Sequence, residues 1–201
     1  MTPLELYDCI KAKYPIHEVE CVCHVESTCN RKGYCLDKQK LPVLDFDKIK
    51  DEYYNGKTIA TPASVDAVCL GSHNKHFCFV EMKGWDNYIN FLDKQKNSIE
   101  ETTDDYNLSG KLQDSQNLCI LLANDKDLFA HMPVVFLLVT DIDVKRHGAV
   151  ALSDMLNKLG GNSSDIYSQC VSKSQETLDS DIHIEHQYVY CREFDNAISV
   201  L

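Results

Sequence analysis

Glu81 and Lys83 stand two residues apart at the end of an apolar run, FCFVEMKGW, at 77–85. Side chains alternate between the two faces of a strand, so these two side chains share one face. If the run at 64–71 (SVDAVCLG) pairs with it across a turn at 72–74, positions whose numbers add to about 147 lie opposite each other. Asp66 then lies opposite a residue near 81. The spacing therefore predicts two carboxylates beside one ammonium group.

Such a group could do phosphodiester chemistry with a divalent cation. Two adjacent carboxylates raise each other's pKa unless a cation lies between them. Mg²⁺ or Mn²⁺ suits a site of one or two carboxylates with waters and substrate phosphate. We therefore expect Asp66 and Glu81 to bind the metal, while Lys83 activates water or stabilises charge on the phosphate. The alternative is a solvated ion pair at a strand end, which contributes little to stability.

The elements that must position these residues follow from the apolar periodicity along the chain. Helices are predicted at 3–14, from Asp45 or Asp47 to the Asn55-Gly56 stop, and at 85–97, 111–125 and 147–161. Strands are predicted at 17–25, 64–71, 75–84, 133–143 and 186–193. The acidic segment at 98–110 is predicted to lack regular structure. The order predicts an α/β single domain, 1–201, with a mixed central sheet flanked by helices.

This order, with Asp66 on one strand and Glu81-Met82-Lys83 on the next, resembles the PD-(D/E)XK (restriction-endonuclease-like) nuclease superfamily. The resemblance covers residues 44–140 and implies an αβββαβ core there, between a Cys-rich N-terminal segment at 1–43 and a C-terminal α/β extension at 141–201. It implies that Asp66 and Glu81 are metal ligands and that Lys83 assists the nucleophilic water. The chain departs from the family pattern at Pro62, which stands four residues before Asp66 instead of adjacent to it.

The resemblance also implies further residues and a function. Glu52, on the helix before the hairpin, is the candidate for an additional catalytic acid, with Asp51 behind it. Gln113 and Gln116, on the helix after the hairpin, are candidates for substrate binding. The implied activity is that of an Mg²⁺-dependent endonuclease acting on DNA rather than RNA, as a subunit of a bacterial defence or restriction assembly. A nuclease-like fold with an inactive site is the alternative, because a fold does not determine activity.

A second candidate site is a cysteine cluster. The chain has ten cysteines, and CVCHVESTCNRKGYC contains Cys21, Cys23, Cys29 and Cys35. Zinc takes four thiolate or imidazole ligands, so these four could bind a structural Zn²⁺, with His24 as a substitute ligand. The paired C-x2-C spacing of common zinc sites is absent. The alternative is a segment of ordinary reduced thiols.

Charge and hydropathy limit the class of protein. The net charge of −11, from 20 Lys and Arg against 31 Asp and Glu, disfavours a free-standing nonspecific nucleic-acid binder. We therefore expect a protein partner or a homo-oligomer to help bring the nucleic acid. The charge also supports a second hypothesis, a non-catalytic interaction protein that binds a basic partner and that zinc at the cysteine cluster could stabilise. No secretory signal is visible and the longest apolar run, 133–139, is too short to cross a bilayer, so we expect a cytoplasmic protein without a membrane partner.

Overall fold

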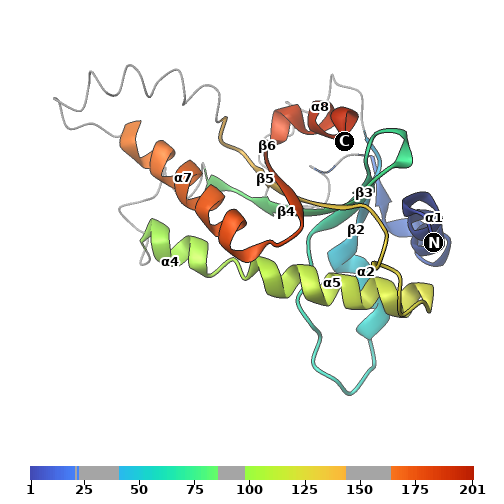
Figure 1. Ribbon diagram of the computed structural model, residues 1–201. Coiled ribbons are helices and arrows are strands. Elements are labelled where there is room, and N and C mark those ends of the chain that lie inside the picture. The colour runs from blue at the N-terminus through green and yellow to red at the C-terminus, as the bar shows by residue number, and fades with distance from the viewer. Residues whose placement is uncertain (21, 23–40, 86–97, 144–163) are drawn as a thin grey trace.

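The computed structural model describes residues 1–20, 22, 41–85, 98–143 and 164–201, which form one mixed sheet with helices on both faces (Figure 1). Six strands lie in the order β1-β2-β3-β4-β5-β6. Their bounds are β1 Glu18–Val19, β2 Val43–Asp45, β3 Ala67–Leu70, β4 Phe77–Lys83, β5 Val134–Thr140 and β6 Glu185–Tyr190. Strands β1 to β4 are antiparallel, whereas β5 runs parallel to β4 and β6 parallel to β5. The predicted α/β class with a mixed sheet is confirmed.

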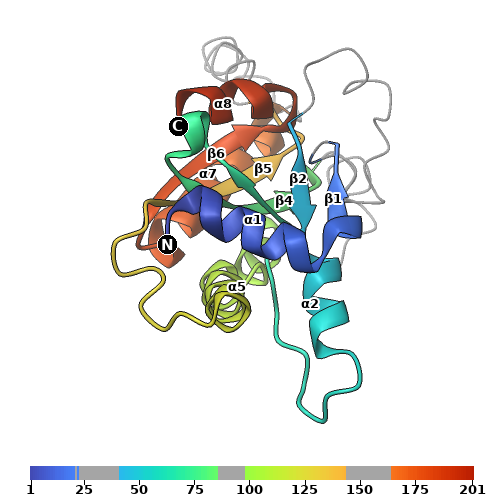
Figure 2. The same cartoon turned by 90° about the vertical axis from the view of Figure 1, so that its right-hand side faces the viewer.

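Helices cover the two faces unequally. Their bounds are α1 Pro3–Lys13, α2 Phe46–Tyr54, α4 Ile99–Asp104, α5 Leu108–Ala123, α7 Ser164–Asp181 and α8 Phe194–Val200. Helices α1, α2, α5 and α7 pack into the larger apolar cluster on one face of the sheet, and α8 packs into the smaller cluster on the other. The two views show α5 and α8 on opposite sides of the strands (Figures 1 and 2). No helix in the described ranges is long and apolar enough to cross a membrane.

The central strand β4 explains why the site lies on the α5 side. Its first residues are apolar on both faces, as expected for a strand covered by helices on both sides. Phe77 and Phe79 belong to the larger cluster, while Cys78 and Val80 belong to the smaller one. The same alternation places Glu81 on the face of Phe79, toward α5.

The predicted hairpin is confirmed, including its register. Ala67 pairs with Val80 and Leu70 with Phe77, so facing residue numbers add to 147. The helices predicted at 3–14, near 45–54 and at 111–125 are present as α1, α2 and α5, with boundaries shifted by up to three residues. The strands predicted at 133–143 and 186–193 are present as β5 and β6.

The prediction for 98–110 is wrong. Helix α4 begins after Ser98, which accepts from the Glu101 N–H, while the Glu101 carboxylate accepts from the Ser98 N–H. This capping box and the acidic first turn favour a helix in a segment that composition alone suggests is solvated. Strand β2 and helices α7 and α8 are present in the structure and were not predicted from the sequence.

Several predictions concern residues outside the described ranges. These are the helices at 85–97, beyond Trp85, and at 147–161, most of the strand at 17–25, and the four candidate zinc ligands. By contrast, Cys69, Cys78 and Cys119 are described and completely buried, in agreement with their apolar sequence context.

Candidate active site

The hairpin brings the two predicted carboxylates together beneath the sheet surface. Asp66 immediately precedes β3, and its Oδ2 accepts a hydrogen bond of 2.5 Å from the backbone N–H of Met82 on β4. Glu81 is the neighbour of Met82 and lies on the same face as Asp66 by the strand register. Glu81 is 0% exposed and Asp66 is 7% exposed. The pair is therefore a buried feature of the fold and not the solvated end of a strand.

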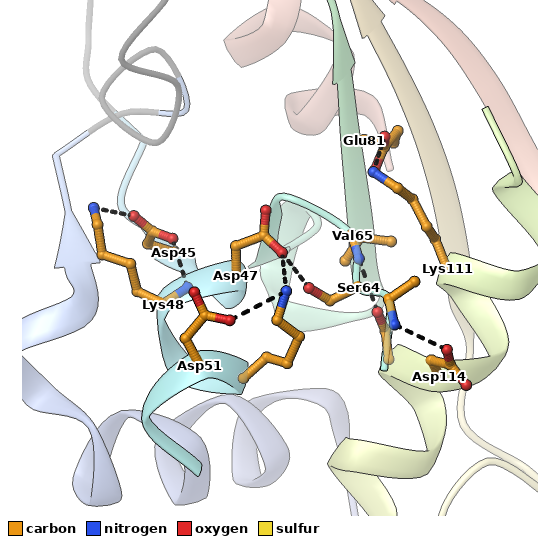
Figure 3. Close-up of polar contacts among 12 residues, drawn as sticks. Asp45, Asp47, Lys48, Asp51, Ser64, Val65, Glu81, Lys111 and Asp114 are labelled. Carbon is orange, nitrogen blue, oxygen red and sulfur yellow. Dashed lines mark hydrogen bonds and ion pairs between the residues drawn. The ribbon is translucent and has the colours of Figure 1, made fainter. Parts of the chain in front are cut away.

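Two ammonium groups neutralise Glu81. Its Oε1 lies 2.6 Å from Nζ of Lys83 and 2.5 Å from Nζ of Lys111. Figure 3 shows Lys111 extending from α5 to Glu81 on β4. The second oxygen, Oε2, is buried and has no hydrogen-bond partner among the described atoms. Oε1 thus contacts two ammonium groups, while both lone pairs of Oε2 are free to accept hydrogen bonds or bind a cation.

The electrostatics follow from burial and from this mixture of charges. Burial, followed by the negative charge of Glu81, raises the pKa of Asp66 to about 7, although the Met82 N–H, Lys111 and Lys83 oppose the rise. Burial lowers the pKa of Lys111, but nearby carboxylates, chiefly Glu81, outweigh this effect and raise it above its ordinary value. The ammonium group of Lys111 is therefore held in its charged form by its carboxylate neighbours.

Helix α5 also holds the segment that leads into Asp66. The hydroxyl of Ser115 accepts from the Val65 N–H at 2.9 Å, and Asp114 accepts from the Ala63 N–H at 3.1 Å (Figure 3). The carbonyl of Asp66 accepts from the first N–H of α2, that of Phe46, at 2.9 Å. A single helix therefore positions both Asp66, through the preceding backbone, and Lys111, through its own side chain.

Aromatic side chains line the Lys83 end of the group. The Lys83 ammonium lies 5.1 Å from the centroid of the Tyr106 ring, and Tyr106 packs edge-on against Trp85 at 5.9 Å. Trp85 is buried, and its backbone N–H donates to Asp141 at the end of β5 at 2.8 Å. This contact fixes the chain just after Lys83 to the neighbouring strand, which limits where Lys83 can move.

The three residues suggested by the family resemblance alone lie elsewhere. Glu52 is half exposed and pairs with His17 at 2.7 Å, on the η1 turn at Pro15–His17. Gln113 is exposed and Gln116 half-buried on α5. At 3.6 residues per turn they lie about 200° and 140° around the helix from Lys111. Their proposed catalytic and substrate-binding roles stay predictions, and no contact of theirs with Glu81 is found among the described residues.

The structure adds two residues that sequence reasoning missed. Lys111 contacts Glu81, and Asp47, on the first turn of α2, is among the carboxylates that raise the pKa of Lys111. Asp47 accepts from the Ser64 hydroxyl and pairs with Lys50 at 2.9 Å (Figure 3). One signal for Lys111 was available: a cation in the first turn of a helix is unfavourable with the helix dipole and indicates a compensating acid nearby.

The donor set fits a hard divalent cation that completes its coordination with other ligands. In the described part of the chain, no three His, Cys, Asp or Glu side chains form a group that could hold a metal ion. Asp66 and Glu81 supply two carboxylates, and Oε2 of Glu81 is a buried acceptor without a partner. Mg²⁺ is commonly bound by one or two carboxylates with waters and substrate phosphates, so two carboxylates match the number of protein ligands that such a site uses.

Comparisons with protein-family models, with curated proteins and with solved structures find no match to this chain.

Proposed function

We propose that this protein is a metal-dependent nuclease that hydrolyses phosphodiester bonds, with DNA as its substrate. The observation that carries the proposal is the buried pair of Asp66 and Glu81 beside Lys83, on one face of a hairpin. Burying two carboxylates together is costly, and cations offset that cost. A hard cation held by this pair would act as a Lewis acid toward the phosphate and the attacking water.

The order of elements supports the same proposal. Helix α1, strands β2, β3 and β4, helix α5 and strand β5 follow the αβββαβ order, with β1 inserted between α1 and β2, α2 between β2 and β3, and α4 before α5. Strand β5 runs parallel to β4, which carries Glu81 and Lys83. This assignment moves the first core helix from the predicted 45–54 to α1. It keeps Asp66 and Glu81 on the central pair of antiparallel strands.

In this proposal each residue has a defined task. Asp66 and Glu81 provide oxygen ligands, and the N–H of Met82 orients the Asp66 carboxylate. Lys83 is 23% exposed, so its ammonium group can reach both Glu81 and solvent. It would orient the attacking water or stabilise negative charge that develops on the phosphate. The net charge of −11 supports a homo-oligomer or a basic protein partner, such as one in a defence assembly, that helps to bring the DNA.

A cleavage assay tests the proposal. Supercoiled plasmid, single-stranded DNA and structured RNA are incubated with the protein in Mg²⁺, Mn²⁺ or EDTA. We expect DNA cleavage with either metal, none in EDTA, and a loss of about 100-fold or more in Lys83→Ala. Lys75→Ala is the matched control, because Lys75 is exposed at the turn of the same hairpin. Cleavage that persists unchanged in Lys83→Ala, or in EDTA, would contradict the proposed site.

One observation favours a second candidate, a non-catalytic interaction protein with an acidic surface. Lys83 and Lys111 already neutralise Glu81, so the group can also serve as a closed ion network that stabilises the strand end. In that case no cleavage occurs with any of the substrates, and Mn²⁺ does not bind to the wild-type chain. Binding of Mn²⁺ that is lost in Asp66→Asn would exclude a closed ion network, and DNA cleavage that requires Lys83 would exclude the non-catalytic candidate as a whole.

A further inference from the structure

The contacts around Glu81 distinguish two kinds of lysine. Both ammonium groups approach the same oxygen, Oε1, so they necessarily lie close together and repel each other. The other oxygen, Oε2, is buried and without a hydrogen-bond partner among the described atoms. Oε1 of Glu81 therefore contacts two ammonium groups, whereas Oε2 can still accept from a new ligand. A cation that enters at Oε2 would meet two positive charges, and one of them must move.

Lys83 is the less free of the two. It lies two residues from Glu81 on the same face of β4, so the strand itself keeps its side chain beside that carboxylate. Its ammonium group also faces the ring of Tyr106. The chain after Lys83 is held beside β5, because the backbone N–H of Trp85 donates a hydrogen bond to Asp141. Moving the Lys83 side chain away would break its contacts with both Glu81 and the Tyr106 ring.

Lys111 is the more easily displaced. It reaches Glu81 from a separate element, α5, through a flexible four-carbon chain, whereas Lys83 lies on the same strand as Glu81. It is the fourth residue of α5, near the positive end of the helix dipole, so the helix does not favour its charge there. Asp47, whose side chain is 44% exposed, is a further nearby carboxylate that favours the charged form of Lys111, although it already pairs with Lys50 and accepts from Ser64. Glu81 is therefore the main contact that retains Lys111.

We propose that Lys111 is a resident counter-cation of Glu81 that leaves the carboxylate when a divalent cation binds to Asp66 and Glu81. This inference rests on the proposed metal site: without a metal ion, Lys111 balances part of the negative charge of the two carboxylates. In the metal-free protein the two carboxylates face two ammonium groups. When the cation binds, Lys111 moves outward and Lys83 stays, so like charges do not accumulate at Glu81.

Competitive labelling of lysines by an amine reagent, quantified by peptide mass spectrometry, tests this exchange in the full chain. Mn²⁺ is added stepwise, and its binding is followed independently by electron paramagnetic resonance. We expect labelling of Lys111 to rise several-fold as Mn²⁺ binds, while labelling of Lys83 and of the exposed Lys126 stays constant. In Glu81→Gln, Lys111 should be labelled strongly without Mn²⁺ and show no response to it.

The outcomes separate this inference from the proposed function. If Mn²⁺ binds, DNA is cleaved and Lys111 labelling does not change, the exchange is wrong and the nuclease proposal stands. If Mn²⁺ binds and Lys111 labelling rises without any cleavage, the exchange stands and the nuclease proposal is wrong. If Mn²⁺ does not bind to the wild-type chain, both are wrong.

Discussion

Asp66 should make the stability of this protein decrease as the pH rises from about 4 to about 7. In the folded protein, burial and the charge of Glu81 raise its pKa to about 7, from an ordinary value of 3.8. A folded-state pKa above the unfolded value means that folding favours the protonated acid. Below pH 4 the Asp66 carboxyl is protonated in both states, so its burial carries no charge penalty in the free energy of unfolding. The penalty for the ionised carboxylate grows between pH 4 and 7 and is complete above pH 7.

The size of the effect follows from the same pKa. Each pH unit between the unfolded and the folded pKa corresponds to about 1.4 kcal/mol, so the full penalty is roughly 4 kcal/mol. Asn at this position keeps an oxygen that can accept from the Met82 N–H and carries no charge at any pH. The free energy of unfolding of the wild type should therefore fall, relative to Asp66→Asn, by roughly 4 kcal/mol between pH 4 and pH 8.

Urea unfolding followed by circular dichroism, in EDTA at pH 4, 5, 6, 7 and 8, measures this difference. Asp104→Asn, which removes an exposed carboxylate at the end of α4, is the matched control and should follow the wild type at every pH. If the stability curves of the wild type and Asp66→Asn run parallel from pH 4 to pH 8, Asp66 does not have a raised pKa. The electrostatic description of the site would then be incorrect.

Two further predictions concern packing around the site. Ser115→Ala removes the acceptor of the buried Val65 N–H and should lower the free energy of unfolding by about 1–3 kcal/mol. Ser109→Ala, at an exposed position of the same helix, is the control and should change the free energy of unfolding little. Equal urea midpoints for the two variants would contradict the role of Ser115. Burial raises the pKa of the Cys170 thiol to about 12 and raises that of Cys119 well above its ordinary value, so iodoacetamide at pH 8 should alkylate both only after unfolding in urea. Peptide mass spectrometry that detects alkylated Cys119 in the folded chain would show that this part of the core is open.

The hairpin and its register could be predicted from the sequence because they depend on local features. A turn-type segment between two β-rich runs sets the pairing, and the two-residue period of a strand puts Glu81 and Lys83 on one face. From these two facts the position of Asp66 opposite Glu81 follows. The capping box of α4 is an equally local feature, but the acidic composition of the segment predicts a solvated loop, and the Ser98 and Glu101 spacing is the signal that indicates the helix.

The tertiary structure decided which other side chains join the carboxylates. Asp47 and Glu52 lie about 140° apart around α2, so only one of them can face the site. Packing of Phe46 and Ile49 into the core turns Asp47 toward Ser64 and leaves Glu52 beside His17. The apolar residues of α2 specify which face turns to the core, but only the tertiary structure shows that Ser64 lies beside Asp47 and His17 beside Glu52.

Lys111 illustrates the same division. It is 30 residues from Glu81 in the sequence, and it reaches the carboxylate only because α5 packs across the face of β4. The sequence by itself determined a carboxylate pair with one lysine, through the short-range geometry of a hairpin. Only the packing of a separate helix decided that a second ammonium group shares Glu81, because contacts between distant elements depend on how the whole core fits together.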